Sequence, residues 1–180
     1  MADEGEGPSL IGAMSWQQFL DVANADTARA KRYRNPLSCL LIEVVHFKPA
    51  DDTQGHAAEH LVLQHFVSIC KATLRAPDYI GRICGGEFAI MLPETLLLQA
   101  LGVAERILEN LAASTSDVSR HHLAATTSIG VAEYDDQTWS VDQFLHAARA
   151  AMHDARQNGR NQAACYLDDL QLMSDAPFVN

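Results

Sequence analysis

The chain has 180 residues, of which 48% are hydrophobic, and this length and composition fit one domain with one core. Its formal net charge of -10 disfavours polyanions such as DNA or an anionic membrane surface as partners. Four scattered cysteines form no CxxC pair, so neither a disulfide framework nor a zinc site is expected. The sequence lacks both an apolar run of roughly 18 residues and a basic signal-peptide start, so we expect a cytoplasmic protein without membrane insertion.

The first part of the chain predicts helices and strands in alternation. Residues 1–9 are polar and Gly-rich, which is typical of a flexible tail. A Ser-x-x-Gln capping pattern at Ser15 predicts a helix that lasts to about Arg34. The apolar run 37–45 is too short for a buried helix and predicts a central strand, and a second helix is expected over 56–74.

The rest of the chain repeats this alternation. The expected elements are a β-hairpin over 79–92, a helix over 95–113, a loop over 114–119, a strand over 123–133, a helix from Ser140 to Asn158-Gly159, and a strand over 163–167. Strands that alternate with helices predict an α/β fold, a three-layer sandwich with helices on both faces of a mixed central sheet. We expect one domain over 10–168 and a C-terminal tail over 169–180.

The most specific motif lies at the expected hairpin. An RxxD pattern, Arg75 and Asp78, precedes the turn sequence Cys84-Gly85-Gly86-Glu87-Phe88. This segment resembles the GGDEF signature of the bacterial diguanylate cyclases, with the upstream RxxD motif at the family's spacing. Further matches extend the resemblance over about residues 10–167: Phe47-Lys48, Gly55-His56, Thr127-Ser128-Ile129-Gly130-Val131-Ala132, Ala151-Met152 and Gly159-Arg160-Asn161.

The resemblance implies a definite chemistry. In that family two domains meet head to head, each holding one GTP, and join them into the second messenger cyclic di-GMP. Acidic groups hold two divalent cations at the triphosphate, and a tight glycine turn lets the backbone approach the phosphates. The resemblance also implies a nucleotidyl-cyclase-like fold whose sheet is mostly antiparallel and whose hairpin carries the signature.

The catalytic half departs from the family pattern. Cys84 stands where the family has its first Gly, and Gly86 where it has Asp, so the hairpin keeps one carboxylate, Glu87. Glu43 replaces the metal-binding Asp at the end of the first strand. We therefore expect Glu43 and Glu87 to be the remnant catalytic and metal-binding residues. An alternative alignment places Gly85-Gly86 on the two family glycines and deletes the Asp; both alignments lose the same carboxylate.

The expected GTP site is altered as well. Asp51 and His60 stand in place of the Asn and Asp that read the guanine edge, and they present different donors and acceptors. Arg156 replaces a Lys that contacts the phosphates. By the resemblance, a vestigial GTP site comprises Lys48, Asp51, His60, Gly85, Gly86, Arg156 and Arg160. Mg²⁺ is expected only if this residual site is used.

The product-binding half, in contrast, is complete. Arg75 and Asp78 match the RxxD motif, and Arg106 falls where the family's second inhibitory-site arginine lies. An arginine fork can donate to guanine O6 and N7 while an Asp accepts from N1 and N2, as a cyclic guanine dinucleotide requires. The structural alternative is that these residues are solvated charges or a local ion pair.

Three function hypotheses follow. The first is a degenerate GGDEF domain, a signalling receptor module that binds cyclic di-GMP through Arg75, Asp78 and Arg106 and needs no cofactor for binding. The second is a weak diguanylate cyclase, converting two GTP into cyclic di-GMP through Glu43 and Glu87, with product feedback inhibition. The third is a dimerisation domain without a ligand. The expected partners are cyclic di-GMP, GTP under the second hypothesis, and a second copy in a ligand-bridged homodimer.

Overall fold

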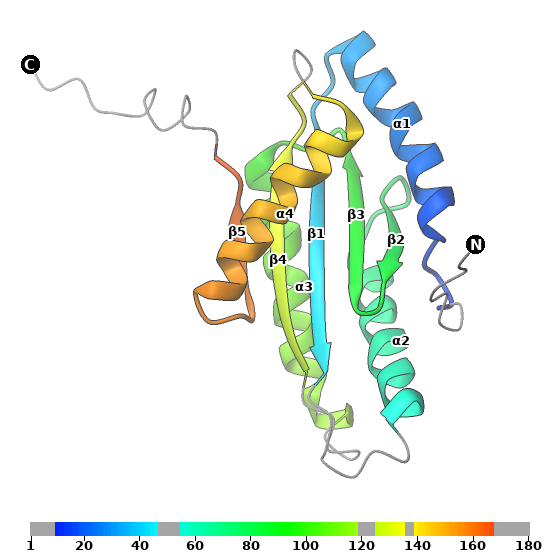
Figure 1. Cartoon of the computed structure of the whole chain (residues 1–180), viewed down its shortest axis with the longest axis vertical. Helices are drawn as coiled ribbons and strands as arrows, with labels where there is room; N and C mark the ends of the chain where they lie inside the picture. Colours follow the sequence, from blue (N-terminus) through cyan, green and yellow to red (C-terminus); the bar gives the residue numbers. More distant parts are fainter. Residues whose placement is uncertain (1–9, 47–54, 119–124, 136–138, 168–180) are drawn as a thin grey trace, which may run out of the picture.

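The computed structural model describes residues 10–46, 55–118, 125–135 and 139–167. Their helices and strands alternate as the sequence predicts (Figure 1). They are α1 (Trp16–Tyr33), β1 (Leu37–His46), α2 (Gly55–Thr73), β2 (Tyr79–Cys84), β3 (Glu87–Pro93), α3 (Leu97–Val118), β4 (Ala125–Glu133), α4 (Val141–Gln157) and β5 (Gln162–Cys165). No helix within the described ranges is both long and apolar enough to cross a bilayer.

The strands form one five-stranded sheet with the order β2-β3-β1-β4-β5. The β2–β3, β3–β1 and β1–β4 pairs are antiparallel, and the β4–β5 pair is parallel. The expected mixed, mostly antiparallel sheet is therefore confirmed. The strand predicted to be central, β1, lies in the middle of the sheet and pairs on both edges.

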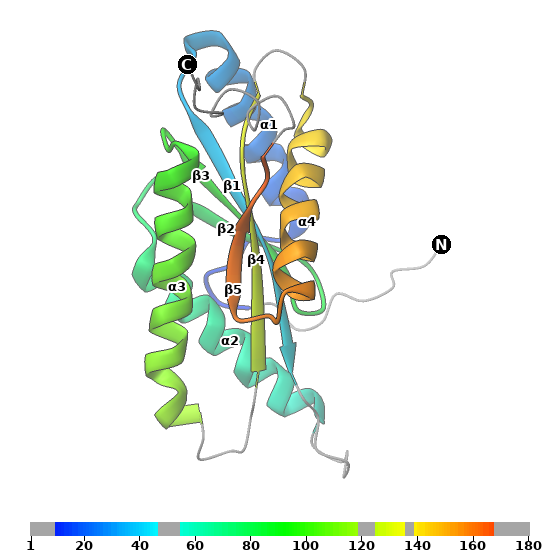
Figure 2. The same cartoon turned by 90° about the vertical axis from the view of Figure 1, so that its left-hand side faces the viewer.

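Two helical layers enclose this sheet. Helices α2 and α3 lie on one face, while α1 and α4 lie on the other (Figures 1 and 2). A hydrophobic core lies on each face of the sheet, and successive residues of β1 point to opposite faces. Leu40 packs into the core under α2 and α3, and Leu41 packs into the core under α1 and α4. A strand buried on both faces needs an unbroken apolar run, which is why β1 shows no polar alternation.

Both predicted capping boxes are present. Ser15 Oγ accepts from the Gln18 backbone N–H, and Gln18 Oε1 accepts from the Ser15 backbone N–H. Ser140 and Gln143 make the same reciprocal pair at the start of α4. Each box satisfies helix N–H groups that would otherwise have no partner, so the two helices on this face begin at defined residues.

The structure corrects one expected boundary. Of the loop expected over 114–119, residues 114–118 are helix instead, because α3 runs to Val118, and residue 119 lies outside the described residues. No Gly or Pro lies between Ala113 and Val118 to stop the helix. The expected tails over 1–9 and 169–180 lie outside the described residues.

Candidate functional site

The two expected carboxylates come together in the structure. Glu43 of β1 and Glu87 of β3 are direct partners across the antiparallel pair. Residues directly opposite one another project to the same face of a sheet. That face is the one covered by α4, whose arginines contact both carboxylates. The structure thus brings together two residues that the resemblance assigned to one site, although they are far apart in the chain; their role stays a prediction.

Each of these carboxylates is paired with an arginine of α4. Arg156 Nη1 lies 3.3 Å from Glu43 Oε1, and Arg149 Nη1 lies 3.0 Å from Glu87 Oε2. Arg156 was predicted as a phosphate contact and here serves as an ion-pair partner. The sequence analysis missed Arg149. Its seven-residue separation from Arg156, which places both on one helix face, is the signal that could have found it.

The residues of this region do not fit a divalent cation. Mg²⁺ prefers about six oxygen ligands in octahedral geometry, several of which are usually water. The second oxygen of Glu43, Oε2, is buried and has no hydrogen-bond partner within the described part of the chain, but one such atom makes no cation site. Across the described ranges, no three His, Cys, Asp or Glu side chains meet in an arrangement that could hold a metal ion.

A cavity of about 260 Å³ lies beside the two carboxylates. It is lined by Glu43, Val44, Val45, Glu59, Leu63, Gly86 and Glu87. Val44 N donates a 2.8 Å hydrogen bond to Gly86 O, and a Cβ at Gly86 would overlap Val44 O. Gly85, the preceding turn residue, has φ +47°. A side chain at Gly86 would therefore clash with β1, and Gly85 adopts a left-handed conformation that glycine accommodates without strain.

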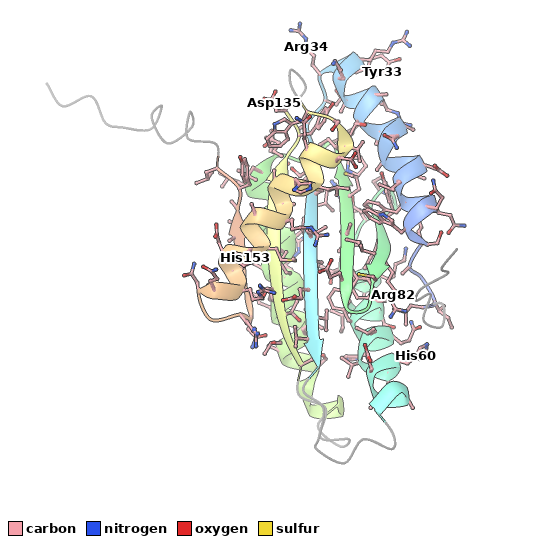
Figure 3. All side chains as sticks on the ribbon, in the orientation of Figure 1. Tyr33, Arg34, His60, Arg82, Asp135 and His153 are labelled. Atoms are coloured by element: carbon pink, nitrogen blue, oxygen red, sulfur yellow. The ribbon has the colours of Figure 1, made fainter. Side chains whose placement is uncertain are left out.

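The remaining residues of the expected GTP site are dispersed. His60 lies on α2 and is half-buried, one residue after the cavity-lining Glu59 (Figure 3). Arg160 follows α4 with φ +61°, and its backbone N–H donates to Ala155 O. Lys48 and Asp51 lie outside the described residues. The structure thus brings Arg156 and Gly86 to the carboxylates and gives no contact that joins His60 or Arg160 to them.

The RxxD motif forms a closed turn between α2 and β2. The Arg75 backbone N–H donates to Asp78 Oδ2 at 2.8 Å, and Arg75 Nη2 lies 3.2 Å from Asp78 Oδ1. The side chain of Asp78 is only 1% exposed, whereas that of Arg75 is 55% exposed. Both carboxylate oxygens of Asp78 are therefore engaged, and the local ion pair that the sequence left as an alternative is present.

A second set of contacts fixes the guanidinium of Arg75. Its Nη2 also donates to Thr95 Oγ1 at 2.7 Å and to Pro93 O at 3.2 Å, which ties the α2–β2 turn to the segment that leads into α3. Its Nη1 has no partner among the described residues. The guanidinium is held on one edge and presents its other edge to solvent.

Arg106 lies near this turn on α3. Asn110 Nδ2 donates to Thr73 Oγ1 at 3.0 Å and so joins α3 to the end of α2. Arg106 is exposed and one helical turn before Asn110, on the same side of the helix. It therefore lies between this contact and the start of α3, where Thr95 holds Arg75. No contact among the described residues joins Arg106 to Arg75 or Asp78, so its place in one site with them stays a prediction.

Comparison with known proteins shows the family of this chain. Residues 10–162 match the family described as "Diguanylate cyclase, GGDEF domain". The chain belongs to the GGDEF family. Diguanylate cyclase A of Treponema denticola is 34% identical over 137 residues, and the response regulator PleD of Caulobacter vibrioides is 35% identical over 135 residues. These alignments cover 76% and 74% of this chain but only 37% and 30% of the relatives, so the domain spans about a third of their length.

Solved GGDEF structures share the fold. The GGEEF domain of a Vibrio cholerae diguanylate cyclase superposes with a TM-score of 0.76 at 26% identity, over 87% of this chain and 99% of that one. The GGDEF domain of DgcB from Caulobacter crescentus gives 0.77 at 22% identity, over 92% and 97%. The expected cyclase-like architecture is thereby confirmed.

This GGDEF domain has a second cavity, of about 300 Å³, between α2, α3 and the sheet. It is lined mainly by apolar side chains, with the hydrogen-bonded pair His65 and Ser114 at 2.9 Å and the side chain of Asn161 among its polar groups. Asn161 Oδ1 accepts from the Thr127 backbone N–H and is thus part of the fold. No local sequence pattern predicts this cavity, because its walls come from five separate segments.

Proposed function

We propose that this GGDEF domain is a receptor module that binds cyclic di-GMP at its RxxD turn and has no effective cyclase activity. The observation that supports binding most is the state of Arg75. Its guanidinium is anchored by Asp78 and Thr95, yet 55% of the side chain is exposed. A guanidinium fixed in advance loses less conformational entropy when it binds a ligand.

In this proposal the three residues have different roles. Arg75 and Arg106 supply donors and positive charge for the guanine edges and phosphates of the dinucleotide. Asp78 holds Arg75 in place, because its carboxylate is buried and both of its oxygens accept from Arg75. Because Asp78 is buried, it would first have to become exposed in order to accept from guanine as the sequence suggested.

Related structures support the choice of ligand. The GGDEF domain of DgcB was solved in complex with cyclic di-GMP, and another microbial GGDEF domain shows a novel interaction mode with the same dinucleotide. For this chain we propose the same ligand. A cyclic di-GMP molecule shared between two exposed arginine edges would also link two copies into a homodimer.

The proposed loss of cyclase activity follows from the carboxylate pair. Glu43 and Glu87 are both neutralised by arginines, and Gly86 brings no third carboxylate. Metal-assisted phosphoryl transfer depends on cations that neutralise the developing charge. A weakly active cyclase is the second candidate, favoured by the cavity of about 260 Å³ beside two carboxylates that lie in register.

Two measurements separate these candidates and the ligand-free alternative. Calorimetric titration with cyclic di-GMP should give saturable binding with at least micromolar affinity, and the ligand should raise the melting temperature. Incubation with GTP and Mg²⁺, followed by chromatography, should yield no product. Binding without turnover supports the receptor. Turnover at about 1 per second or faster would establish a cyclase, and the absence of both would leave only a structural domain.

A further inference from the structure

Helix α4 places the two arginines beside the carboxylates. Helix α4 packs on β4 so closely that a Cβ at Gly130 would overlap backbone atoms of Ala148 and Met152. This contact lies next to Arg149 and one turn before Arg156, and Phe144 anchors the start of the helix in the core. This close contact sets the distance between α4 and the sheet. It therefore brings Arg149 and Arg156 within contact of Glu87 and Glu43.

Arginines of α4 pair with two of the three carboxylates that line the pocket, Glu43 and Glu87. Glu43 and Glu87 are only 17% and 26% exposed, so their negative charges are partly removed from water and need a counter-charge. Each receives one from α4, at 3.3 Å and 3.0 Å. A divalent cation beside these carboxylates would also be repelled by the two arginine charges that pair with them.

His153 makes a further contact with Arg156. Its Nδ1 lies 3.3 Å from Arg156 Nη2, and its Nε2 lies 2.7 Å from the side-chain amide of Gln157, all on the last turns of α4 (Figure 3). Arg156 is thus contacted from its own helix as well as by Glu43.

We propose that Arg149 and Arg156 act as built-in counter-charges for Glu87 and Glu43 in place of a divalent cation, so that this pocket takes no divalent cation. The arginines offset the negative charges of Glu43 and Glu87 that would otherwise attract such an ion. This inference concerns a different part of the domain from the RxxD turn and is independent of cyclic di-GMP binding.

The test uses Mn²⁺ as the probe, on the whole chain and without nucleotide. Calorimetry and the electron paramagnetic resonance signal of free Mn²⁺ measure binding to the wild type, to Arg149→Gln/Arg156→Gln, and to Arg149→Lys/Arg156→Lys. The Gln variant removes both charges and should bind Mn²⁺ at least about tenfold more tightly than the wild type, since two like charges close to the ion are lost. The Lys variant keeps the charges and should resemble the wild type.

Controls assign the effect to the pocket. Arg29→Gln removes an arginine that pairs with Asp26 on α1 and should leave Mn²⁺ binding unchanged. Adding Glu87→Gln to the Gln variant should abolish the gained binding, and circular dichroism confirms that each variant is folded. Wild-type binding of Mn²⁺ that Glu87→Gln removes would overturn the proposal. So would a folded Gln variant that binds no more tightly than the wild type, because the arginines would then not be what excludes the ion.

Discussion

The backbone N–H of Arg75 and its guanidinium both donate to the same buried carboxylate, that of Asp78. The RxxD spacing therefore builds a self-contained turn in which the first residue is held by the last. Since the side chain of Asp78 is 1% exposed, this turn contributes to the stability of the fold as well as to the proposed ligand site. The two contributions can be separated by mutation.

Asp78→Ala should lower the free energy of unfolding by about 1–3 kcal/mol, because the Arg75 backbone N–H loses its acceptor at a buried position. Urea denaturation measures the change. Asp21→Ala on the exposed face of α1 is the matched control and should alter stability by no more than about 0.5 kcal/mol. Equal stability of the two variants would show that Asp78 does not hold the turn.

Arg75→Ala should weaken cyclic di-GMP binding by about 1–3 kcal/mol, as expected for one bidentate contact to a base. Arg106→Ala should weaken it in the same direction with little effect on stability, since Arg106 is exposed. Calorimetry measures both, with Arg32→Ala at the exposed end of α1 as the control that should bind normally. If Arg75→Ala and Arg32→Ala bind equally well, the site does not lie at the RxxD turn.

The sequence predicted the fold well because its strongest signals are local. The apolar run of β1 and the capping boxes at Ser15 and Ser140 each specify an element within a few residues. The predicted end of α3 was wrong because it also rested on a local signal. Polar residues suggested a loop, but no residue there breaks a helix.

The site was predicted less completely because it depends on distant packing. The Glu43–Glu87 pair could be anticipated from the family resemblance, but its arginine partners come from α4, more than 60 residues further along the chain. Their reach is set by the contact of α4 with Gly130, which no local pattern encodes. The burial of Asp78 likewise depends on how the whole turn packs.

The pH dependence of stability should report the contact between α1 and β2. Tyr79 Oη donates to Asp26 Oδ2 at 2.9 Å, and burial, aided by the Asp26 charge, raises the pKa of Tyr79. The native state then holds this proton more tightly than the unfolded state, whose tyrosine pKa is about 10. The stabilisation is complete below that pH and is lost as the pH rises toward the higher native pKa.

Tyr79→Phe should therefore make the loss of stability above about pH 10 shallower. At neutral pH it should cost about 1 kcal/mol for the missing hydrogen bond. Urea denaturation across this range provides the measurement, and Tyr33→Phe at an exposed position should keep the wild-type slope. Burial also raises the pKa values of Cys39 and Cys70, so part of the decline should persist in Tyr79→Phe. Identical slopes for Tyr79→Phe and the wild type would contradict the assignment.

The hairpin turn should reject any side chain at Gly86. An added Cβ meets the carbonyl oxygen of Val44 in the neighbouring strand, so Gly86→Ala should destabilise the domain by about 1–3 kcal/mol. Gly102→Ala is the control: nothing lies near its added Cβ, and Ala in a helix should raise stability by about 0.5–1 kcal/mol. Thermal unfolding should show a lower melting temperature for Gly86→Ala and a higher one for Gly102→Ala than for the wild type.

The same clash bears on restoring the family signature. Cys84→Gly/Gly86→Asp supplies the missing glycine and carboxylate, but an Asp at position 86 can be seated only if β3 moves away from the Val44 carbonyl. Even then Glu43 and Glu87 remain paired with Arg156 and Arg149. We therefore expect the double variant to be less stable than the wild type and to form no cyclic di-GMP from GTP and Mg²⁺, as followed by chromatography. Rapid product formation would mean that the hairpin adapts at little cost and that those two residues alone silence the enzyme.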